Sequence, residues 1–359
     1  MFTLVVMDST KPKLTWKTLL FPLIGLVAFF LYIYLFEVDI LSIIETAKTT
    51  NLLIFAVAIG CGFLEIFFFA ISWHSLTRHL NIKMTIKKAY LYLWYSIYVD
   101  ILVPAESISG EVIRTYLLTR DKCGSFGKVV ASLFTHRLLG MAMNVLILVL
   151  GVVLLSIEAQ VSTAVLNVII AVAVAIASLT IILAALSSRK TLTLKIVNWV
   201  SKIATKISMG KWTLLKLKTQ ATEISDNFHD AMVEFRQNKK PLLESLLYLG
   251  VTWFFSLCVP YLVFWSLGYP VSWSVILVTA AIVLAVKSIP VGIPFEVGLP
   301  EATMTTLYFS MGIPAELAAT ATILTRLITL WLRFFVGFSV QQYIELKPVI
   351  AHECLDGKN

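Results

Sequence analysis

The chain has 359 residues, of which 58% are hydrophobic and only 14% are charged, and its mean hydropathy is +0.87. Soluble globular domains carry about 25% charged residues, so this composition excludes an ordinary soluble protein. The net charge of +8 is typical of some nucleic-acid-binding proteins. Here, however, Lys and Arg gather in a few loops between apolar segments, which is the pattern of membrane topology, and we expect no nucleic-acid partner.

Long apolar stretches follow one another along the chain. A helix needs about 20 apolar residues to cross the hydrocarbon layer. The first stretch, Leu19–Phe36, follows three lysines but is not followed by a small-residue cleavage site, so we interpret it as a retained span. The further complete spans are expected at Leu52–Trp73, Val129–Ile157, Val161–Leu186, Leu242–Leu267 and Ala318–Gln341. The sequence therefore predicts an all-α, polytopic integral membrane protein with about eight membrane segments in one domain over residues 1–359.

Basic loops give the orientation of these spans. The loop Ser187–Lys240 is rich in Lys and Arg, which places it in the cytoplasm. Within it, Glu223–Phe235 has the apolar spacing of an amphipathic helix that packs against the membrane domain. The basic stretch Lys195–Lys218 either lies on an anionic leaflet or forms a solvated linker. We expect a multi-pass protein of the plasma (cytoplasmic) membrane with both termini in the cytoplasm.

Two further apolar segments are interrupted partway. If Ala89–Val103 were a complete span, four basic residues between positions 114 and 128 would lie outside, against the charge rule. A re-entrant hairpin that breaks at Pro104–Glu111 and returns to the same side removes this conflict. A second break, Pro290–Pro300, precedes the short apolar helix Glu301–Met311. We therefore predict two broken hairpins.

The two broken regions form an internal repeat. Glu111 precedes the pair Arg137-Leu138 by 26 residues, and Glu301 precedes the pair Arg326-Leu327 by 25 residues. Taken with the preceding spans, the repeats cover residues 52–157 and 242–341, and the basic amphipathic loop 187–240 lies between them. Because the first hairpin enters from the cytoplasm and the second from outside, the arrangement predicts an inverted-topology repeat.

Inverted repeats place a substrate site near the midplane, where half-helix ends line a cavity. Ser107 or Ser109 is a candidate N-cap for a half-helix that begins near Gly110, and Pro300 suits the first turn of a second half-helix that begins at Glu301. The free N–H groups and dipoles of both ends favour an anion such as a lipid phosphate. The candidate headgroup- or phosphate-binding residues are Ser109, Gly110, Glu111, Arg114, Arg137, Gly298, Glu301 and Arg326.

Charged residues in the bilayer need a partner or a watery cavity, because each costs roughly 2.5–3.5 kcal/mol at the centre. Arg137 and Arg326 either pair with nearby carboxylates or bind substrate. Arg114 follows Glu111 by three residues, which allows an ion pair on one helix. Alternatively, the Arg114 guanidinium exchanges that partner for a phosphate, which it can grip with two N–H groups.

Three further charged residues lie in or near the membrane segments. Glu65 and Lys287 are possible proton or ion-pair partners. Arg333 lies closer to the cytoplasmic end, where we expect its side chain to reach the interface.

These motifs resemble a known family. The runs Gly110-Glu111…Arg114 and Arg137-Leu138, and later Gly298…Glu301 and Arg326-Leu327, are similar to the lysylphosphatidylglycerol synthase/flippase-like transmembrane family. The resemblance implies a membrane domain that moves lipid between leaflets, with aminoacylated phospholipids or polyprenyl-phosphate-linked sugars as substrates. Larger relatives add a soluble aminoacyltransferase domain. The few residues after Gln341 are too short for it, so we expect no lipid aminoacylation here.

The leading functional hypothesis is a lipid translocase whose partners are anionic or polyprenyl-phosphate-linked membrane lipids. One alternative is a membrane-embedded transferase acting on lipid-linked substrates. The sequence has no H-E-x-x-H or G-x-S-x-G motif, and only His136 beside Arg137 suggests catalysis. We therefore expect no enzymatic activity, no metal and no cofactor. The other alternative is a non-transporting subunit that anchors a soluble transferase through Ser187–Lys240.

Overall fold

The computed structural model describes Glu45 and residues 48–103, 108–158, 163–187, 227–287 and 298–346. Every regular element in these ranges is helical, as the sequence predicts. The expected first span Leu19–Phe36, the basic stretch Lys195–Lys218 and the central residues of both breaks, 104–107 and 288–297, lie outside the described part.

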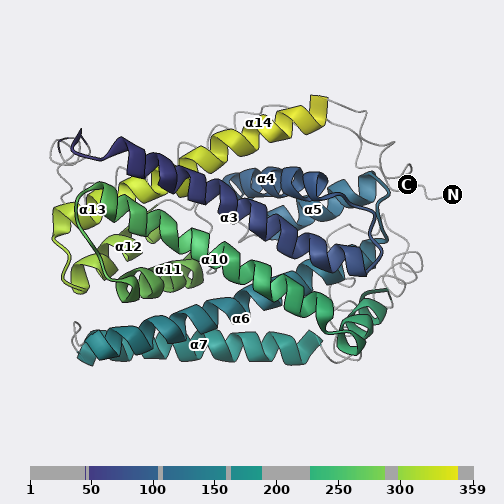
Figure 1. Ribbon diagram of the computed structural model, residues 1–359. Coiled ribbons are helices and arrows are strands. Elements are labelled where there is room, and N and C mark those ends of the chain that lie inside the picture. Colours follow the sequence, from purple (N-terminus) through teal and green to yellow (C-terminus); the bar gives the residue numbers. More distant parts are fainter. Residues whose placement is uncertain are drawn as a thin grey trace, which may run out of the picture.

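The helices form two series of the same pattern (Figure 1). The first series is α3 (Leu52–His79), α4 (Ile86–Leu102), α5 (Ile108–Arg120) and α6 (Phe126–Glu158), followed by α7 (Thr163–Ser187). The second series is α10 (Lys240–Ser266), α11 (Trp273–Lys287), α12 (Leu299–Ser310) and a long helix made of α13 (Ala315–Arg326), the π-helix η2 (Leu327–Leu332) and α14 (Arg333–Leu346).

Helix lengths repeat between the two series. The first series has helices of 28, 17, 13 and 33 residues, and the second has 27, 15, 12 and 32 residues. In the described part, four helices are long and apolar enough to cross a membrane, and these are the outer members of each series. The protein is thus a multi-pass membrane protein in which each pair of long helices brackets two short ones.

The helices α3 and α10 pack side by side in opposite directions. The N–H of Asn51, at the start of α3, donates to the carbonyl of Ser266 at the end of α10 (2.8 Å). Near the other end, the hydroxyls of Ser72 and Ser245 are 2.8 Å apart. The two series therefore begin with helices of opposite sense.

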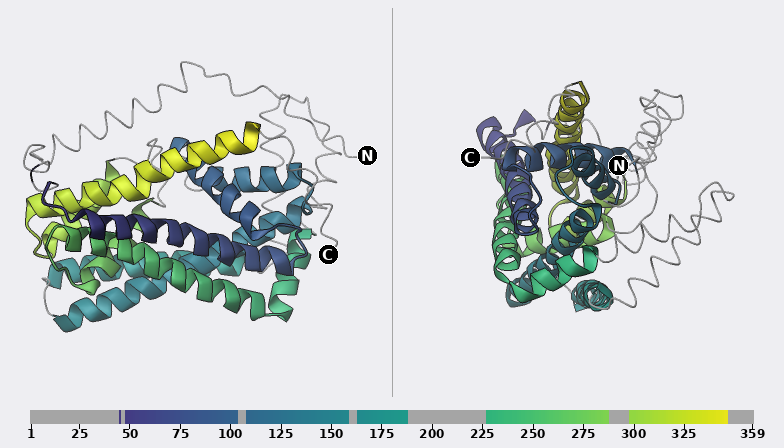
Figure 2. Two further views of the ribbon diagram at one scale, coloured as in Figure 1. Left: turned by 45° about the horizontal axis from the view of Figure 1, so that its top comes forward. Right: turned by 90° about the vertical axis from the view of Figure 1, so that its right-hand side faces the viewer.

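The short-helix pairs lie at opposite ends of the bundle, as Figures 1 and 2 show. The N–H of Lys83, before α4, donates to the carbonyl of Cys123, after α5 (2.9 Å), so this pair begins and ends where α3 ends. In the other pair, the ring of Tyr308 in α12 packs edge-on against Phe264 near the end of α10, with centroids 4.9 Å apart. The two short-helix pairs therefore lie toward opposite ends of the bundle.

Each long fourth helix packs against the first short helix of the other series: α14 against α4, and α6 against α11. Both contacts depend on glycine. A Cβ on Gly337 would lie 2.8 Å from the carbonyl oxygen of Trp94, and one on Gly151 would lie 2.9 Å from the Cβ of Leu277. These reciprocal contacts join the two series into one body.

The amphipathic segment of the central loop is helical over residues 227–237 and packs against the bundle. Phe235 is buried and stacks on His79 at the end of α3. Phe228 contacts Phe134 of α6, with centroids 5.8 Å apart. This confirms the predicted packing for the described part of the segment.

Prediction for the glycine contact. We expect Gly337→Ala to destabilise the protein by about 1–3 kcal/mol, because the added methyl group meets backbone atoms of α4 that cannot move independently. Gly140→Ala is the matched control, since a Cβ there has no neighbour within 4 Å and alanine favours the helix. Thermal unfolding in detergent measures both. Equal stability of the two variants would show that the close approach is not needed.

Candidate functional site

The glutamates and arginines matched in the sequence are in contact in the structure. Arg137 Nη1 of α6 lies 3.4 Å from Glu111 Oε1 of α5, and Arg326 Nε of α13 lies 2.5 Å from Glu301 Oε1 of α12. In each series, an ion pair thus joins the second short helix to the long helix after it. Of the two roles weighed for these arginines, pairing with a nearby carboxylate is observed.

The second pair is buried and also caps a helix. Glu301 is 1% exposed and Arg326 is 4% exposed. The other oxygen of Glu301 accepts from the N–H of Gly298 (2.7 Å), which precedes α12. Gly298 has φ of 100°, a backbone conformation that favours glycine. Glu301 therefore holds the start of α12 and neutralises Arg326.

The start of α5 is held by a residue that the sequence analysis did not single out. Asp100, in the last turn of α4, accepts from the N–H of Gly110 and from the hydroxyl of Ser109, both at 2.6 Å. A Cβ on Gly110 would lie 2.2 Å from Asp100 Oδ2, so this approach requires glycine. Ser109 is a donor inside α5 and not its N-cap, which corrects one of the two N-cap expectations; the other candidate, Ser107, lies outside the described residues. The available signal was an acidic residue within the apolar run that ends just before Pro104.

Arg114 is the unusual member of the site. It is 7% exposed, and its guanidinium lies over the ring of Trp73, 5.1 Å from the centroid. Its Nε and Nη1 have no hydrogen-bond partner among the described residues. Glu111, which could have paired with it, bonds Arg137 instead, although Glu111 and Asp100 both act electrostatically on Arg114. Buried polar groups are normally hydrogen-bonded, so these N–H groups suit an incoming acceptor.

Glu65, Arg333 and Lys287 are the other charged residues that the sequence places in or near the membrane segments. Glu65 of α3 pairs with Arg333, with Oε2 and Nη2 2.5 Å apart, and both side chains are largely buried. The π-helix η2 separates Arg333 from Arg326, and such segments occur frequently at functional sites. Lys287 is the last residue of α11, beside the undescribed residues 288–297.

His136 lies in a buried structural cluster. Its Nε2 is 3.1 Å from the Ser72 hydroxyl, and its ring packs edge-on against Phe69. Ser72 is bonded in turn to Ser245, so this chain of contacts ties α6, α3 and α10 together. Among the described residues, no group of three or more His, Cys, Asp or Glu side chains is placed to hold a metal ion.

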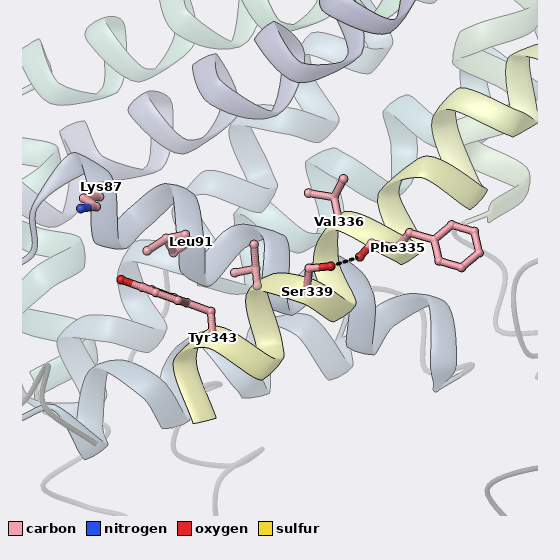
Figure 3. A pocket seen from close by; sticks show the side chains of 7 residues that line it. Lys87, Leu91, Phe335, Val336, Ser339 and Tyr343 are labelled. Atoms are coloured by element: carbon pink, nitrogen blue, oxygen red, sulfur yellow. Dashed lines mark hydrogen bonds between the residues drawn. The ribbon is translucent and has the colours of Figure 1, made fainter. Parts of the chain in front are cut away.

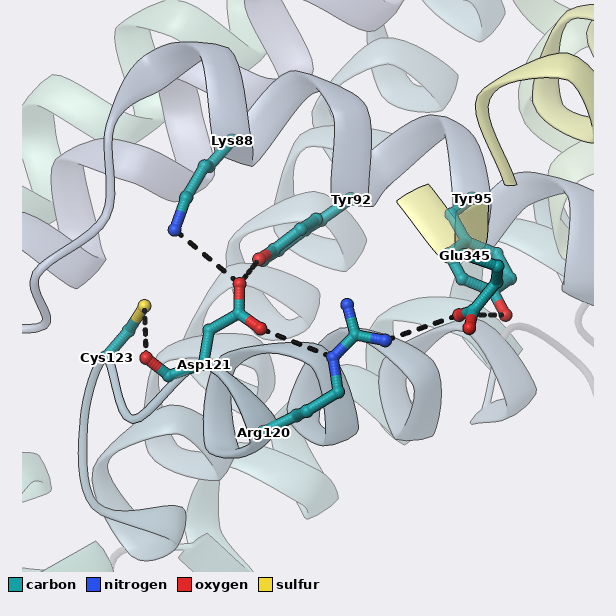
Figure 4. Close-up of polar contacts among 7 residues, drawn as sticks. All are labelled: Lys88, Tyr92, Tyr95, Arg120, Asp121, Cys123 and Glu345. Atoms are coloured by element: carbon teal, nitrogen blue, oxygen red, sulfur yellow. Dashed lines mark hydrogen bonds and ion pairs between the residues drawn. The ribbon is translucent and has the colours of Figure 1, made fainter. Parts of the chain in front are cut away.

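A second polar cluster fastens the α4–α5 pair to α14 (Figure 4). Its centre is Asp121, which accepts a hydrogen bond from Tyr92 and forms ion pairs with Lys88 (3.5 Å) and Arg120 (3.3 Å). Arg120 also reaches Glu345 of α14 (3.4 Å). Sequence reasoning missed this cluster because its members are distant along the chain and follow no repeat.

Comparison with known proteins supports the family resemblance that the sequence motifs indicate. The family model described as the transmembrane region of lysylphosphatidylglycerol synthase matches residues 22–337. A UPF0104 membrane protein of Pyrococcus horikoshii is 23% identical over 278 residues, covering 76% of this chain and 82% of that protein. One from Methanocaldococcus jannaschii is 23% identical over 268 residues, covering 74% and 77%. One from Methanothermobacter thermautotrophicus is 20% identical over 286 residues, covering 80% and 84%.

Prediction for the two ion pairs. We expect Glu301→Ala to destabilise the protein by about 3–5 kcal/mol, because Arg326 is left charged and buried. Glu111→Ala is expected to cost no more than about 1 kcal/mol, since that pair is partly exposed. Unfolding by SDS in mixed micelles compares them. The double change Glu301→Met with Arg326→Met is expected to recover most of the stability that Glu301→Ala loses. Equal destabilisation by Glu301→Ala and Glu111→Ala would show that the different burial of the two ion pairs does not matter for stability.

Proposed function

This chain belongs to the family of lysylphosphatidylglycerol synthase transmembrane regions, and we propose that it is a lipid translocase that moves an anionic or lipid-linked headgroup between membrane leaflets. The proposal places both termini and the loop 187–240 on the cytoplasmic side of the plasma membrane. The whole chain then acts as a single flippase-like domain with membrane lipids as its partners.

The proposed framework is an inverted repeat formed by residues 52–157 and 242–341. Each repeat contains one re-entrant hairpin. Three observations support it. The two series have helix lengths that agree to within two residues, they begin with antiparallel helices α3 and α10, and their short-helix pairs lie at opposite ends. A complete span for α4 or α11 is disfavoured because these helices have only 17 and 15 residues. In this arrangement, the breaks after α4 and α11 meet the midplane from opposite leaflets.

The observation that carries the proposal is the buried guanidinium of Arg114. Its Nε and Nη1 have no partner in the described part of the chain, yet they are enclosed with Asp100 and Glu111 nearby. A phosphate oxygen can accept from either of these N–H groups without breaking an existing bond in the described part of the chain, and hydrogen bonds between a guanidinium and a phosphate are strengthened by charge. Arg137 then offers a second positive charge as Glu111 shifts away from it. The headgroup passes through this site while its acyl chains stay in the lipid.

The two halves of the proposed site have different roles. Met304 stands in α12 at the place that Arg114 has in α5, three residues after the glutamate. The Glu301–Arg326 pair is fully enclosed, with Gly298 bound to the same carboxylate. We therefore assign phosphate recognition to the first half, through Arg114, Arg137 and Glu111. The residues of the second half hold α12 and α13 in place.

Prediction for transport. In proteoliposomes, the protein is expected to speed the transbilayer movement of a fluorescent phosphatidylglycerol, measured by chemical quenching of the outer leaflet. Arg114→Ala is expected to slow it about ten-fold or more, because each charge-assisted hydrogen bond contributes about 1.5–3 kcal/mol. Arg78→Ala is the control, since Arg78 is exposed and pairs with Glu244 at the bundle end. Thermal unfolding checks that Arg114→Ala remains folded.

Three outcomes would contradict the proposal. Unchanged lipid movement with wild-type protein present would exclude translocation of this lipid class. A covalently altered lipid recovered from the vesicles would instead identify a membrane-embedded transferase. Inert behaviour in vesicles together with co-purification of a soluble transferase would indicate a non-transporting subunit.

A further inference from the structure

Two apolar grooves on the outside of the bundle meet at one lysine. The first lies between α4 and α14, has a volume of about 490 Å³, and is lined by Leu91, Val336 and Tyr343 among others. The second lies between α3 and α4, has a volume of about 430 Å³, and is lined by Phe67 and Tyr90 among others. Lys87 lines both. Both volumes fall within the range of about 300–1,000 Å³ that is usual for small-molecule sites.

Lys87 differs sharply from its neighbour in the sequence. Lys88 is buried and forms an ion pair with Asp121. Lys87 is exposed, and no carboxylate among the described residues lies within ion-pair distance of its ammonium group. It is the second residue of α4, where the positive end of the helix dipole adds to its own charge. An anion at this position would be attracted both by the ammonium group of Lys87 and by the positive end of the helix dipole.

The first groove changes from polar to apolar along its length (Figure 3). The hydroxyl of Tyr343 lies toward the Lys87 end, and Phe335 lies at the other end. The hydroxyl of Ser339, midway, donates to the carbonyl of Phe335 in its own helix (2.9 Å) and is therefore satisfied. Because α4 begins and α14 ends at the same end of the bundle, the polar end lies at the headgroup level and the apolar end points toward the midplane.

We propose that Lys87 and its two flanking grooves form a binding site for one anionic phospholipid, whose phosphate meets Lys87 and whose two acyl chains lie one in each groove. The two acyl chains of a phospholipid match two apolar grooves that share one lysine. A soluble anion has no chain to fill the grooves, and a single-chain amphiphile fills only one of them. The site uses none of the residues around Arg114 and does not depend on the proposed transport.

The test is lipid retention measured by native mass spectrometry of the full chain in detergent, titrated with phosphatidylglycerol or phosphatidylcholine. Lys87→Ala is expected to weaken phosphatidylglycerol binding about five-fold, the typical contribution of one lysine to binding an anionic lipid. Phosphatidylcholine is expected to bind weakly to both proteins. Lys239→Ala is the matched control, because Lys239 is also exposed at the start of a helix, α10, but lines neither groove.

A second variant tests the grooves themselves. Ser339→Phe places a ring in the first groove from an exposed position, so it is expected to weaken binding of phosphatidylglycerol but not of its single-chain lyso form, which fits the second groove. Glycerol phosphate without acyl chains is expected not to compete. Equal weakening by Lys87→Ala and Lys239→Ala would show only general charge attraction. An unchanged affinity in Ser339→Phe, or competition by glycerol phosphate, would overturn the two-groove site.

Discussion

The structure depends on one constraint: a charge enclosed among membrane helices has little water to solvate it, so it needs an opposite charge, a polar cavity or a polar ligand beside it. In each series, an acidic residue near the start of a short helix meets an arginine of the following long helix. These ion pairs lie near the starts of α5 and α12, where backbone N–H groups also need acceptors. Asp100 and Glu301 supply those acceptors, so the same kind of group stabilises both the charge and the helix start.

The two series share a framework but not a chemistry. Glycine at Gly151 and Gly337 lets each long fourth helix approach a short helix of the other series, and this reciprocal contact holds the short-helix pairs from outside. Inside, the second pair is closed by an enclosed ion pair, whereas the first contains a buried arginine with N–H groups to spare. Hence two series of similar helix lengths enclose different chemistry, and in the proposed function only the first binds the headgroup.

Polar contacts at the end where α3 terminates bind the first short-helix pair firmly to α14. The cluster around Asp121 joins the start of α4, the end of α5 and the end of α14. Next to it, Lys87 faces outward between two apolar grooves. Neighbouring lysines on one helix turn thus have different environments, because Lys88 is buried beside Asp121 and Lys87 is exposed. A lipid resident there would touch both α14 and α3, and so both series.

The sequence by itself determined the class of protein, the four long apolar helices of the described part and the matched spacing of glutamate and arginine, because hydrophobic length and an internal repeat are local or periodic signals. The tertiary structure alone decided which charges meet. Spacing suggested that Arg114 pairs with Glu111, but the fold brings Arg137 to that carboxylate and leaves Arg114 over Trp73. It also placed Asp100 at the start of α5 and Arg333 beside Glu65. Such partners depend on how helices pack in space, and spacing along the chain does not encode that.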